Sequence, residues 1–181
     1  SFVATRMLDR IDGIDVELVG PDPTAVSMAG VEVSTPGALT ELGSYQAVIV
    51  GSGRNTFDHI ANDALMDDFA LERSDTTLLG AQCSGAAILF RLKLIDGVAV
   101  CTDRTTAPKL RDLGVTVADE AFRADGNLAT AGGCLSSAYL AFWIISKLTT
   151  TEKAIAALEY VAPVGEAGGG RGAAPARPPP P

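Results

Sequence analysis

The chain has 181 residues, of which 47% are hydrophobic and 20% charged, as is typical of one globular domain with a sizeable core. Its 14 basic and 22 acidic residues give a formal net charge of −8. Nucleic-acid binding relies on a basic surface, so this charge balance favours other classes of protein.

The three cysteines, Cys83, Cys101 and Cys134, lie far apart in the chain. An odd number of cysteines at such spacings does not form a disulfide framework. The sequence contains no Cys-x-x-Cys pair, so a structural zinc site is not expected. No apolar run approaches the ~20 residues that a membrane-spanning helix needs. We therefore expect a cytoplasmic protein that uses no metal or cofactor and binds neither nucleic acid nor a membrane.

The first part of the chain is predicted to alternate helices and strands. Apolar residues on one side predict a helix over 1–12, and apolar and acidic residues alternate over 14–19 as in a half-exposed strand. Five elements follow: a turn at 20–23, a strand at 31–33, a helical turn at 40–42, an all-apolar strand at 47–50, and a helix over 56–73 with a break near Asn62-Asp63.

The second part continues the alternation. Its predicted elements are strands at 76–81, 98–101, 115–117, 121–124 and 127–130, helices over 84–94, 133–149 and 151–160, and a helical turn at 108–113. Asp125-Gly126 predicts a hairpin turn between the last two strands, and Thr151 is the predicted cap of the last helix.

Strands that alternate with helices predict an α/β fold, with a mostly parallel sheet and helices on both faces. We assign residues 1–164 to this single domain. Residues 165–181 consist mainly of Gly, Ala, Pro and Arg. Such a segment cannot bury enough apolar surface to offset its ordering entropy, so it is predicted to be a disordered tail.

The segment around Cys83 carries the most specific chemistry. A buried strand ends at Gln82 and a helix starts just after it, and the small residues Ser84 and Gly85 allow a tight turn. Such a turn presents its side chain at the carboxyl edge of the sheet, where open α/β folds bind ligands. The helix amides are expected to lower the pKa of the thiol and to hold an oxyanion. A small residue that only packs is the alternative interpretation.

Five segments, in order, resemble the ThiJ/PfpI superfamily, relatives of the glutamine-amidotransferase domain. They are 47–53, a strand and an oxyanion turn; 82–86, a cysteine elbow; 94–97, a helix end; 100–103, a strand that often ends in Thr-His; and 125–133, before the last long helix. The resemblance implies a flavodoxin-like three-layer sandwich, commonly a homodimer. It does not imply one activity, since the fold carries hydratases, deglycases, amidases, chaperones and regulators.

The chain departs from this family in two places. Many members pair the cysteine with a histidine where this chain has Asp103, and the only histidine, His59, is predicted on a solvated helix face. Members also open with an apolar strand and a loop that carries an acidic partner of the cysteine. We expect that strand to be missing here, which would open a gap in the sheet and expose backbone hydrogen-bonding groups.

Within the superfamily, the isocyanide hydratases work without this histidine, and the chain resembles them in lacking it. The resemblance implies that Cys83, followed by the hydroxyl residue Ser84, attacks the isocyanide carbon, and that water then releases an N-formyl product from a thioimidate. Gly53 and Ser84 match the family's oxyanion donors. The resemblance further assigns Ser52, Thr102 and Asp103 to the pocket: Ser52 beside Gly53, and the other two at a strand end.

We expect a small-molecule substrate, whose identity stays open. Two other functions also stay open for this chain. One is a ligand- or redox-sensing stress-response module without turnover, although the Pro/Gly-rich tail stands where regulators carry a helix-turn-helix domain. The other is a glyoxalase or deglycase that acts on 2-oxoaldehydes through Cys83, which the lack of histidine at position 103 weakens. Cys101 and Cys134 are predicted to pack in the interior.

Overall fold

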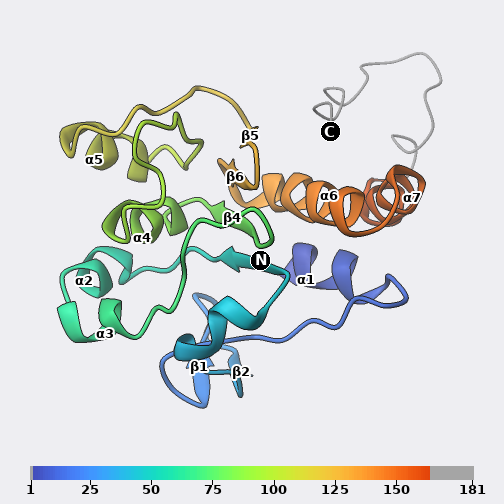
Figure 1. The fold of residues 1–181 in the computed structure, drawn as a ribbon, viewed down its shortest axis with the longest axis horizontal. Helices are drawn as coiled ribbons and strands as arrows, with labels where there is room; N and C mark the ends of the chain where they lie inside the picture. Colours follow the sequence, from blue (N-terminus) through green and yellow to red (C-terminus); the bar gives the residue numbers. More distant parts are fainter. Residues whose placement is uncertain (1, 164–181) are drawn as a thin grey trace.

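The central sheet has the strand order β3-β4-β6-β5 in a computed structural model that describes residues 2–163 (Figure 1). Its strands are β3 Ala47–Val50, β4 Leu78–Gln82, β5 Phe122–Asp125 and β6 Leu128–Ala131. β3, β4 and β6 run parallel, whereas β5 pairs antiparallel with β6 across the turn at Gly126. The predicted α/β class and mostly parallel sheet are confirmed.

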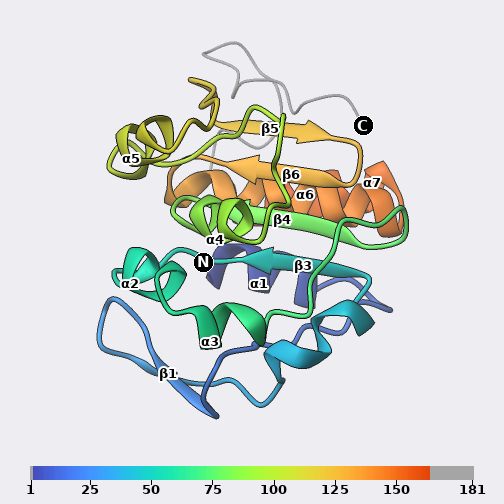
Figure 2. The ribbon, with the colours of Figure 1, turned by 60° about the vertical axis from the view of Figure 1, so that its left-hand side comes forward.

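Helices cover both faces of this sheet, which makes three layers (Figures 1 and 2). On one face lie α1 Phe2–Asp9, α6 Ser137–Leu148 and α7 Thr151–Val161; on the other lie α2 Thr56–Ile60, α3 Asp63–Asp67, α4 Gly85–Arg91 and α5 Thr106–Asp112. Each face has its own apolar core. Leu78 of β4 packs with α6, and its neighbour Leu79 packs with α4. Because successive strand residues point to opposite faces, β4 must be free of charged residues throughout.

The elements between α1 and β3 are short. β1 Thr24–Val26 and β2 Glu32–Ser34 form an exposed antiparallel hairpin, and the 3-10 turn η1 Leu39–Ser44 leads into β3. A second 3-10 turn, η2 Cys134–Ser136, joins β6 to α6. The sequence predicted β2 but not β1, because a three-residue exposed strand carries no periodic pattern.

Three predicted strands are wrong, because in the structure they form only single bridges. Segments 98–101 and 115–117 meet at the Val100–Val117 pair, and 14–19 pairs only through Val19 with Gly37. The predicted alternation over 14–19 is present, with its apolar residues half-buried and its acidic residues exposed. The segment forms no ladder because no described strand lies beside it.

Side-chain caps decide two helix boundaries. The break predicted near Asn62-Asp63 is confirmed, since the Asn62 side chain accepts a hydrogen bond from the Leu65 amide and starts α3, but the helical part ends at Asp67 and not at residue 73. The cap of α7 is Thr150 and not Thr151, since the Thr150 hydroxyl accepts from the Lys153 amide at 3.3 Å. A cap residue needs an extended backbone, which Thr150 has, whereas Thr151 is already helical.

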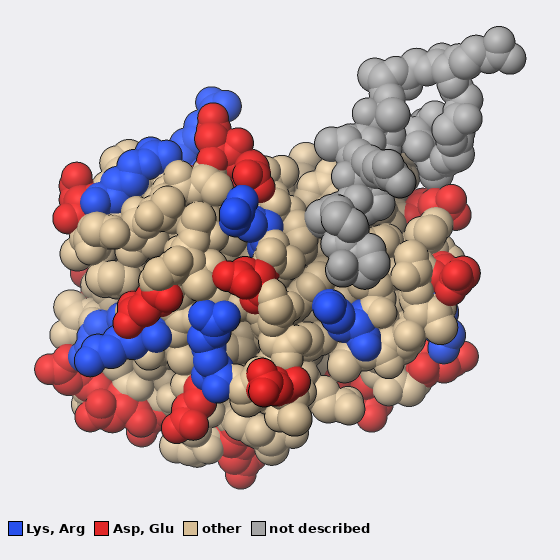
Figure 3. Space-filling model, turned by 45° about the horizontal axis from the view of Figure 1, so that its top comes forward, with Lys and Arg blue, Asp and Glu red and all other residues tan. Residues whose placement is uncertain are grey.

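The surface carries both signs of charge. On the face drawn in Figure 3, Lys and Arg side chains are interspersed with Asp and Glu. Among the described residues, no helix is long and apolar enough to cross a membrane. The tail predicted at 165–181 lies outside the described residues.

Candidate functional site

Cys83 lies in the turn between β4 and α4 with a left-handed backbone, at a φ of 51°. Residues other than glycine rarely adopt this conformation, and such strain is concentrated at functional turns. The Cys83 N–H donates to the Ala131 carbonyl at 2.8 Å, and the Cys83 carbonyl accepts from Thr102 Oγ1 at 2.7 Å. The turn is therefore held by Ala131, at the end of β6, and by Thr102. The strand, turn and helix predicted from the sequence are present.

The start of α4 requires glycine at position 85. A Cβ atom there would lie 2.2 Å from the Val50 carbonyl oxygen and 3.0 Å from that of Gly51. Real Cβ atoms do not approach a backbone oxygen this closely, so α4 begins in direct backbone contact with the end of β3. This contact brings Ser84 against the turn that follows β3.

Ser84 and Gly53, predicted as oxyanion donors, lie against each other in the structure. The Ser84 hydroxyl lies 2.8 Å from the hydroxyl of Thr56, and the Gly53 N–H donates to both hydroxyl oxygens at 3.3 and 3.2 Å respectively. The Gly53 amide is thus occupied, and it can serve a substrate oxyanion only by exchanging these bonds. Ser52 is half-buried in the same turn. Thr56, which is 2% exposed, was missed because only the folded chain brings it to Ser84.

Burial raises the pKa of the Cys83 thiol to about 11. Only 4% of the residue is exposed, and loss of hydration disfavours the thiolate. The N–H of Gly133 donates to the sulfur and opposes this shift, whereas Cys134 and Asp103 add to it. The expectation of a lowered pKa is therefore wrong: one amide donor does not outweigh burial, and the thiol is neutral at pH 7.

Asp103 starts α5. Its carboxylate accepts hydrogen bonds from the backbone N–H groups of Thr105 and Thr106, at 2.9 and 3.0 Å, and from the Thr106 hydroxyl at 2.7 Å. Burial alone would raise the pKa of Asp103, but these bonds outweigh it and lower the pKa. Asp103 is thus an ionised cap whose charge lies near Cys83. His59 is exposed on α2, which confirms that it is a solvated helix residue.

Cys134 is the residue of the site that the sequence analysis misjudged. It is exposed rather than packed, and its side chain hydrogen-bonds that of Cys83. Gln82 Nε2 donates to the Cys134 carbonyl at 3.0 Å and holds η2 against the end of β4. The available signal was the glycine pair Gly132-Gly133, which directly follows β6, a strand paired with β4. For Cys101 a packing role is confirmed, since it is fully buried.

A mostly parallel sheet covered by helices on both faces, with a cysteine in a strained strand-to-helix turn, is the architecture of a class of α/β proteins. Residues 2–147 match the DJ-1/PfpI family, and the chain therefore belongs to that family. No curated protein sequence matches the chain significantly.

Solved structures show the same fold. Drosophila melanogaster DJ-1beta is 20% identical, with a TM-score of 0.72 over 88% of each chain. A ThiJ/PfpI family protein from Pseudomonas syringae is 16% identical, with a TM-score of 0.74 over 90% of this chain and 69% of that one. An Anabaena variabilis protein with DJ-1/ThiJ/PfpI-like and ferritin-like domains is 21% identical, with a TM-score of 0.71 over 82% of this chain. The chain spans only 44% of that two-domain protein. These structures confirm the flavodoxin-like sandwich.

Proposed function

We propose that the protein is a cysteine-dependent enzyme acting on small molecules, and that it hydrates isocyanides with Cys83 as the nucleophile. The observation that carries the proposal is the strained backbone of Cys83, at a φ of 51°. Packing alone gives no reason to hold a cysteine in a conformation that costs roughly 1–3 kcal/mol. The same turn aims a nucleophile out of the carboxyl edge of the sheet in other enzyme classes.

The neutral state of the thiol is compatible with this chemistry. The Cys83 sulfur forms a bond to the terminal carbon of the isocyanide, and the thiol proton passes to the same carbon, which gives a thioimidate. Water then adds its oxygen to that carbon while one of its protons passes to the nitrogen; the carbon–sulfur bond breaks, the other proton goes to the sulfur, and the N-formyl amine leaves. One neutral thiol thus supplies both the nucleophile and the first proton.

The charges around the thiol favour an uncharged substrate. Asp103 is ionised close to Cys83 and would repel a carboxylate or phosphate. Isocyanides carry no net charge and can enter a buried site without losing a strong hydration shell. The Gly133 N–H donates to the Cys83 sulfur, and the hydroxyls of Ser84 and Thr56, which hydrogen-bond each other and the Gly53 carbonyl, could donate to a substrate only by exchanging these bonds.

Glyoxalase or deglycase activity is supported less well. That chemistry requires a base for proton transfers on a 2-oxoaldehyde. The Asp103 carboxylate is engaged in capping α5, and His59 is exposed on α2. Neither Asp103 nor His59 is therefore free to act as that base for Cys83.

A second candidate function, a thiol-based redox response, is favoured by the contact of Cys134 with Cys83. A hydroperoxide would oxidise the Cys83 sulfur to a sulfenic acid and be reduced to an alcohol or water. The Cys134 sulfur would then displace water from that sulfenic acid and form a disulfide. Cys134 is the second thiol in this reaction, and its exposure makes it accessible.

One set of variants separates the two candidates. The wild-type protein and the variants Cys83→Ala, Cys134→Ser and Cys101→Ala are each incubated with an alkyl isocyanide, and the N-formyl product is quantified. The hydratase proposal requires turnover that is lost only in Cys83→Ala. In a parallel hydroperoxide treatment, peptide mapping without reductant tests for a Cys83–Cys134 disulfide, which must be absent in Cys134→Ser if the redox proposal holds.

A further inference from the structure

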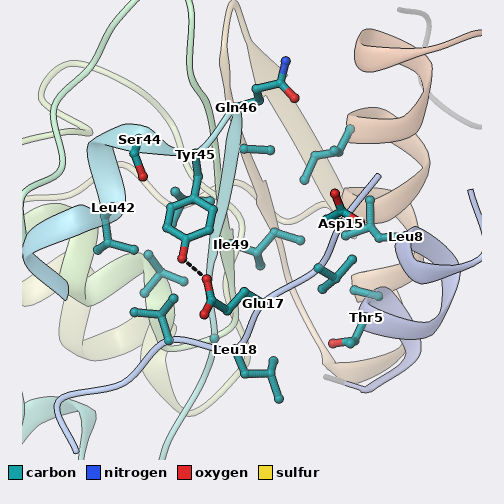
Figure 4. A pocket seen from close by; sticks show the side chains of 18 of the residues that line it. Thr5, Leu8, Asp15, Glu17, Leu18, Leu42, Ser44, Tyr45, Gln46 and Ile49 are labelled. Atoms are coloured by element: carbon teal, nitrogen blue, oxygen red, sulfur yellow. Dashed lines mark hydrogen bonds between the residues drawn. The ribbon is translucent and has the colours of Figure 1, made fainter. Parts of the chain in front are cut away.

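The polar groups around the thiol turn include one that the mechanism above does not use, the hydroxyl of Thr56. Thr56 begins α2, is 2% exposed, and lies against Ser84, the residue that follows Cys83. A cavity of about 600 Å³ along β3, where the Tyr45 hydroxyl donates to Glu17, is a separate feature, because neither Cys83 nor Thr56 lines it (Figure 4). A buried hydroxyl must find its partners within the protein, so the partners of Thr56 define its role.

The proton of the Thr56 hydroxyl is held by the Gly53 carbonyl. Thr56 Oγ1 lies 2.8 Å from the Gly53 carbonyl oxygen. A hydroxyl has one proton and a carbonyl has none, so the hydroxyl must be the donor in this contact. Without that proton, the two oxygens would repel each other at this distance. Thr56 can therefore only accept hydrogen bonds from its other partners.

Ser84 is consequently the donor in its contact with Thr56. The two hydroxyl oxygens lie 2.8 Å apart, and the Thr56 proton is already used. The other acceptor within reach of the Ser84 hydroxyl is the Gly53 carbonyl, which is farther away at 3.4 Å. Thr56 thus holds the Ser84 proton inside this cluster of hydroxyls and backbone groups.

Ser84 then has an acceptor to offer but no donor. Its oxygen accepts from the Gly53 N–H at 3.3 Å, which uses one of its two lone pairs. A serine at the start of a helix usually accepts from the first helix amides as well. Ser84 makes no such bond to α4, and no further donor from residues 2–163 reaches its oxygen. One lone pair is therefore available in the residue next to Cys83.

Hydrolysis of the thioimidate requires an acceptor of this kind. The water that adds its oxygen to the carbon must direct a lone pair at that carbon, so its protons have to be held by acceptors elsewhere. The Asp103 carboxylate already accepts three hydrogen bonds at the start of α5. Ser84 Oγ has an unused lone pair and follows the thiol directly in the chain.

We propose that Ser84 Oγ accepts a hydrogen bond from the hydrolytic water, and that Thr56 is the positioning residue that keeps Ser84 in this state. The inference rests on the proposed hydratase function and assigns both hydroxyls to its second half, the hydrolysis of the thioimidate. The water oxygen bonds to the carbon, one water proton passes to the nitrogen, the carbon–sulfur bond breaks, and the other proton goes to the sulfur. Neither hydroxyl gains or loses a proton overall.

The test separates formation of the Cys83 adduct from its decay. Wild type, Thr56→Val, Thr56→Ser and Ser84→Ala are each mixed with an alkyl isocyanide, and intact-mass spectrometry follows the adduct while the N-formyl amine is quantified. Valine keeps the shape of threonine without its hydroxyl. In Thr56→Val the adduct should form at the wild-type rate and decay about tenfold more slowly, as expected for one lost hydrogen bond, so that it accumulates. Ser84→Ala should behave alike, and Thr56→Ser should restore the wild-type decay.

A double variant distinguishes positioning from a merely structural role. If Thr56 acts through Ser84, the adduct should decay no more slowly in Thr56→Val/Ser84→Ala than in Ser84→Ala alone. A structural role would instead add a further loss. Thr77→Val is the matched control, because Thr77 is a buried threonine just before β4, at the end of that strand away from Cys83. It should leave both rates unchanged.

The outcomes separate this inference from the function on which it rests. No adduct and no product from the wild type would overturn both. Wild-type turnover with unchanged decay in Thr56→Val, or with slower adduct formation in place of slower decay, would overturn the inference alone. The fluorescence of the buried Trp143 reports folding. If Thr56→Val does not fold, Ser84→Ala decides, because wild-type decay in that variant would also overturn the inference.

Discussion

At the scale of single residues, the turn at Cys83 depends on a glycine two positions later. Gly85→Ala places a Cβ 2.2 Å from the Val50 carbonyl oxygen, so we expect the free energy of unfolding to fall by about 2 kcal/mol or more. Gly51→Ala is the matched control, because its Cβ would meet no atom within 4 Å, and it should change stability by no more than ~0.5 kcal/mol. Urea denaturation measures both; equal effects would contradict the contact between α4 and β3.

The ionisation of Cys83 gives a second prediction at this scale. Alkylation of Cys83 by iodoacetamide should rise with pH up to a midpoint near its pKa of about 11. Asp103→Asn removes a negative charge near the sulfur, so it should shift that midpoint to lower pH. Peptide mass spectrometry follows each cysteine separately.

Cys101 is the internal control for this measurement. Burial also raises its pKa to about 11, but the charges near it are Glu120 and Arg123 rather than Asp103. Its midpoint should therefore be the same in the wild type and in Asp103→Asn. A parallel shift at both cysteines would mean that the substitution loosens the fold and does not act through charge.

At the scale of elements, the cap of α7 can be tested directly. Thr150→Ala removes the hydroxyl that accepts from the Lys153 amide, and should lower the free energy of unfolding by about 1 kcal/mol. Thr151→Ala, one residue along, should be close to neutral, because Thr151 lies inside the helix. Thermal denaturation of the two variants decides; a larger loss in Thr151→Ala would restore the cap predicted from the sequence.

The elements that the sequence predicted best are those with local signals. The strands at 47–50 and 76–81 are uncharged, apolar-rich runs, and Asp125-Gly126 specifies the hairpin between β5 and β6. Segment 14–19 has the alternation of a strand but forms no ladder, because pairing depends on a neighbour that a periodic pattern cannot reveal. β1 is short and exposed, so it has no such pattern at all.

For the site, the sequence indicated the positions better than their physical state. Cys83, Ser84 and Gly53 come together at the carboxyl ends of β3 and β4, as expected from parallel strands. The pKa of Cys83 was predicted in the wrong direction because burial arises only from tertiary packing. Cys134 was missed because its contact with Cys83 spans about fifty residues of chain, and the glycine pair before it does not specify that contact.

At the scale of the whole molecule, helices cover both faces of a mostly parallel sheet, and each face has its own apolar core. The turn at Cys83 lies between these layers, where β4 ends and α4 begins.

The family resemblance and the geometry of the turn converge on Cys83, and turnover tests it most directly. The measurement is production of the N-formyl amine from an alkyl isocyanide by the wild-type protein and by Cys83→Ala, with Cys101→Ala as the control. We predict multiple turnovers in the wild type and in Cys101→Ala, and none in Cys83→Ala. No product from the wild type, or the same rate in Cys83→Ala, would contradict the role of Cys83 as the nucleophile of an isocyanide hydratase.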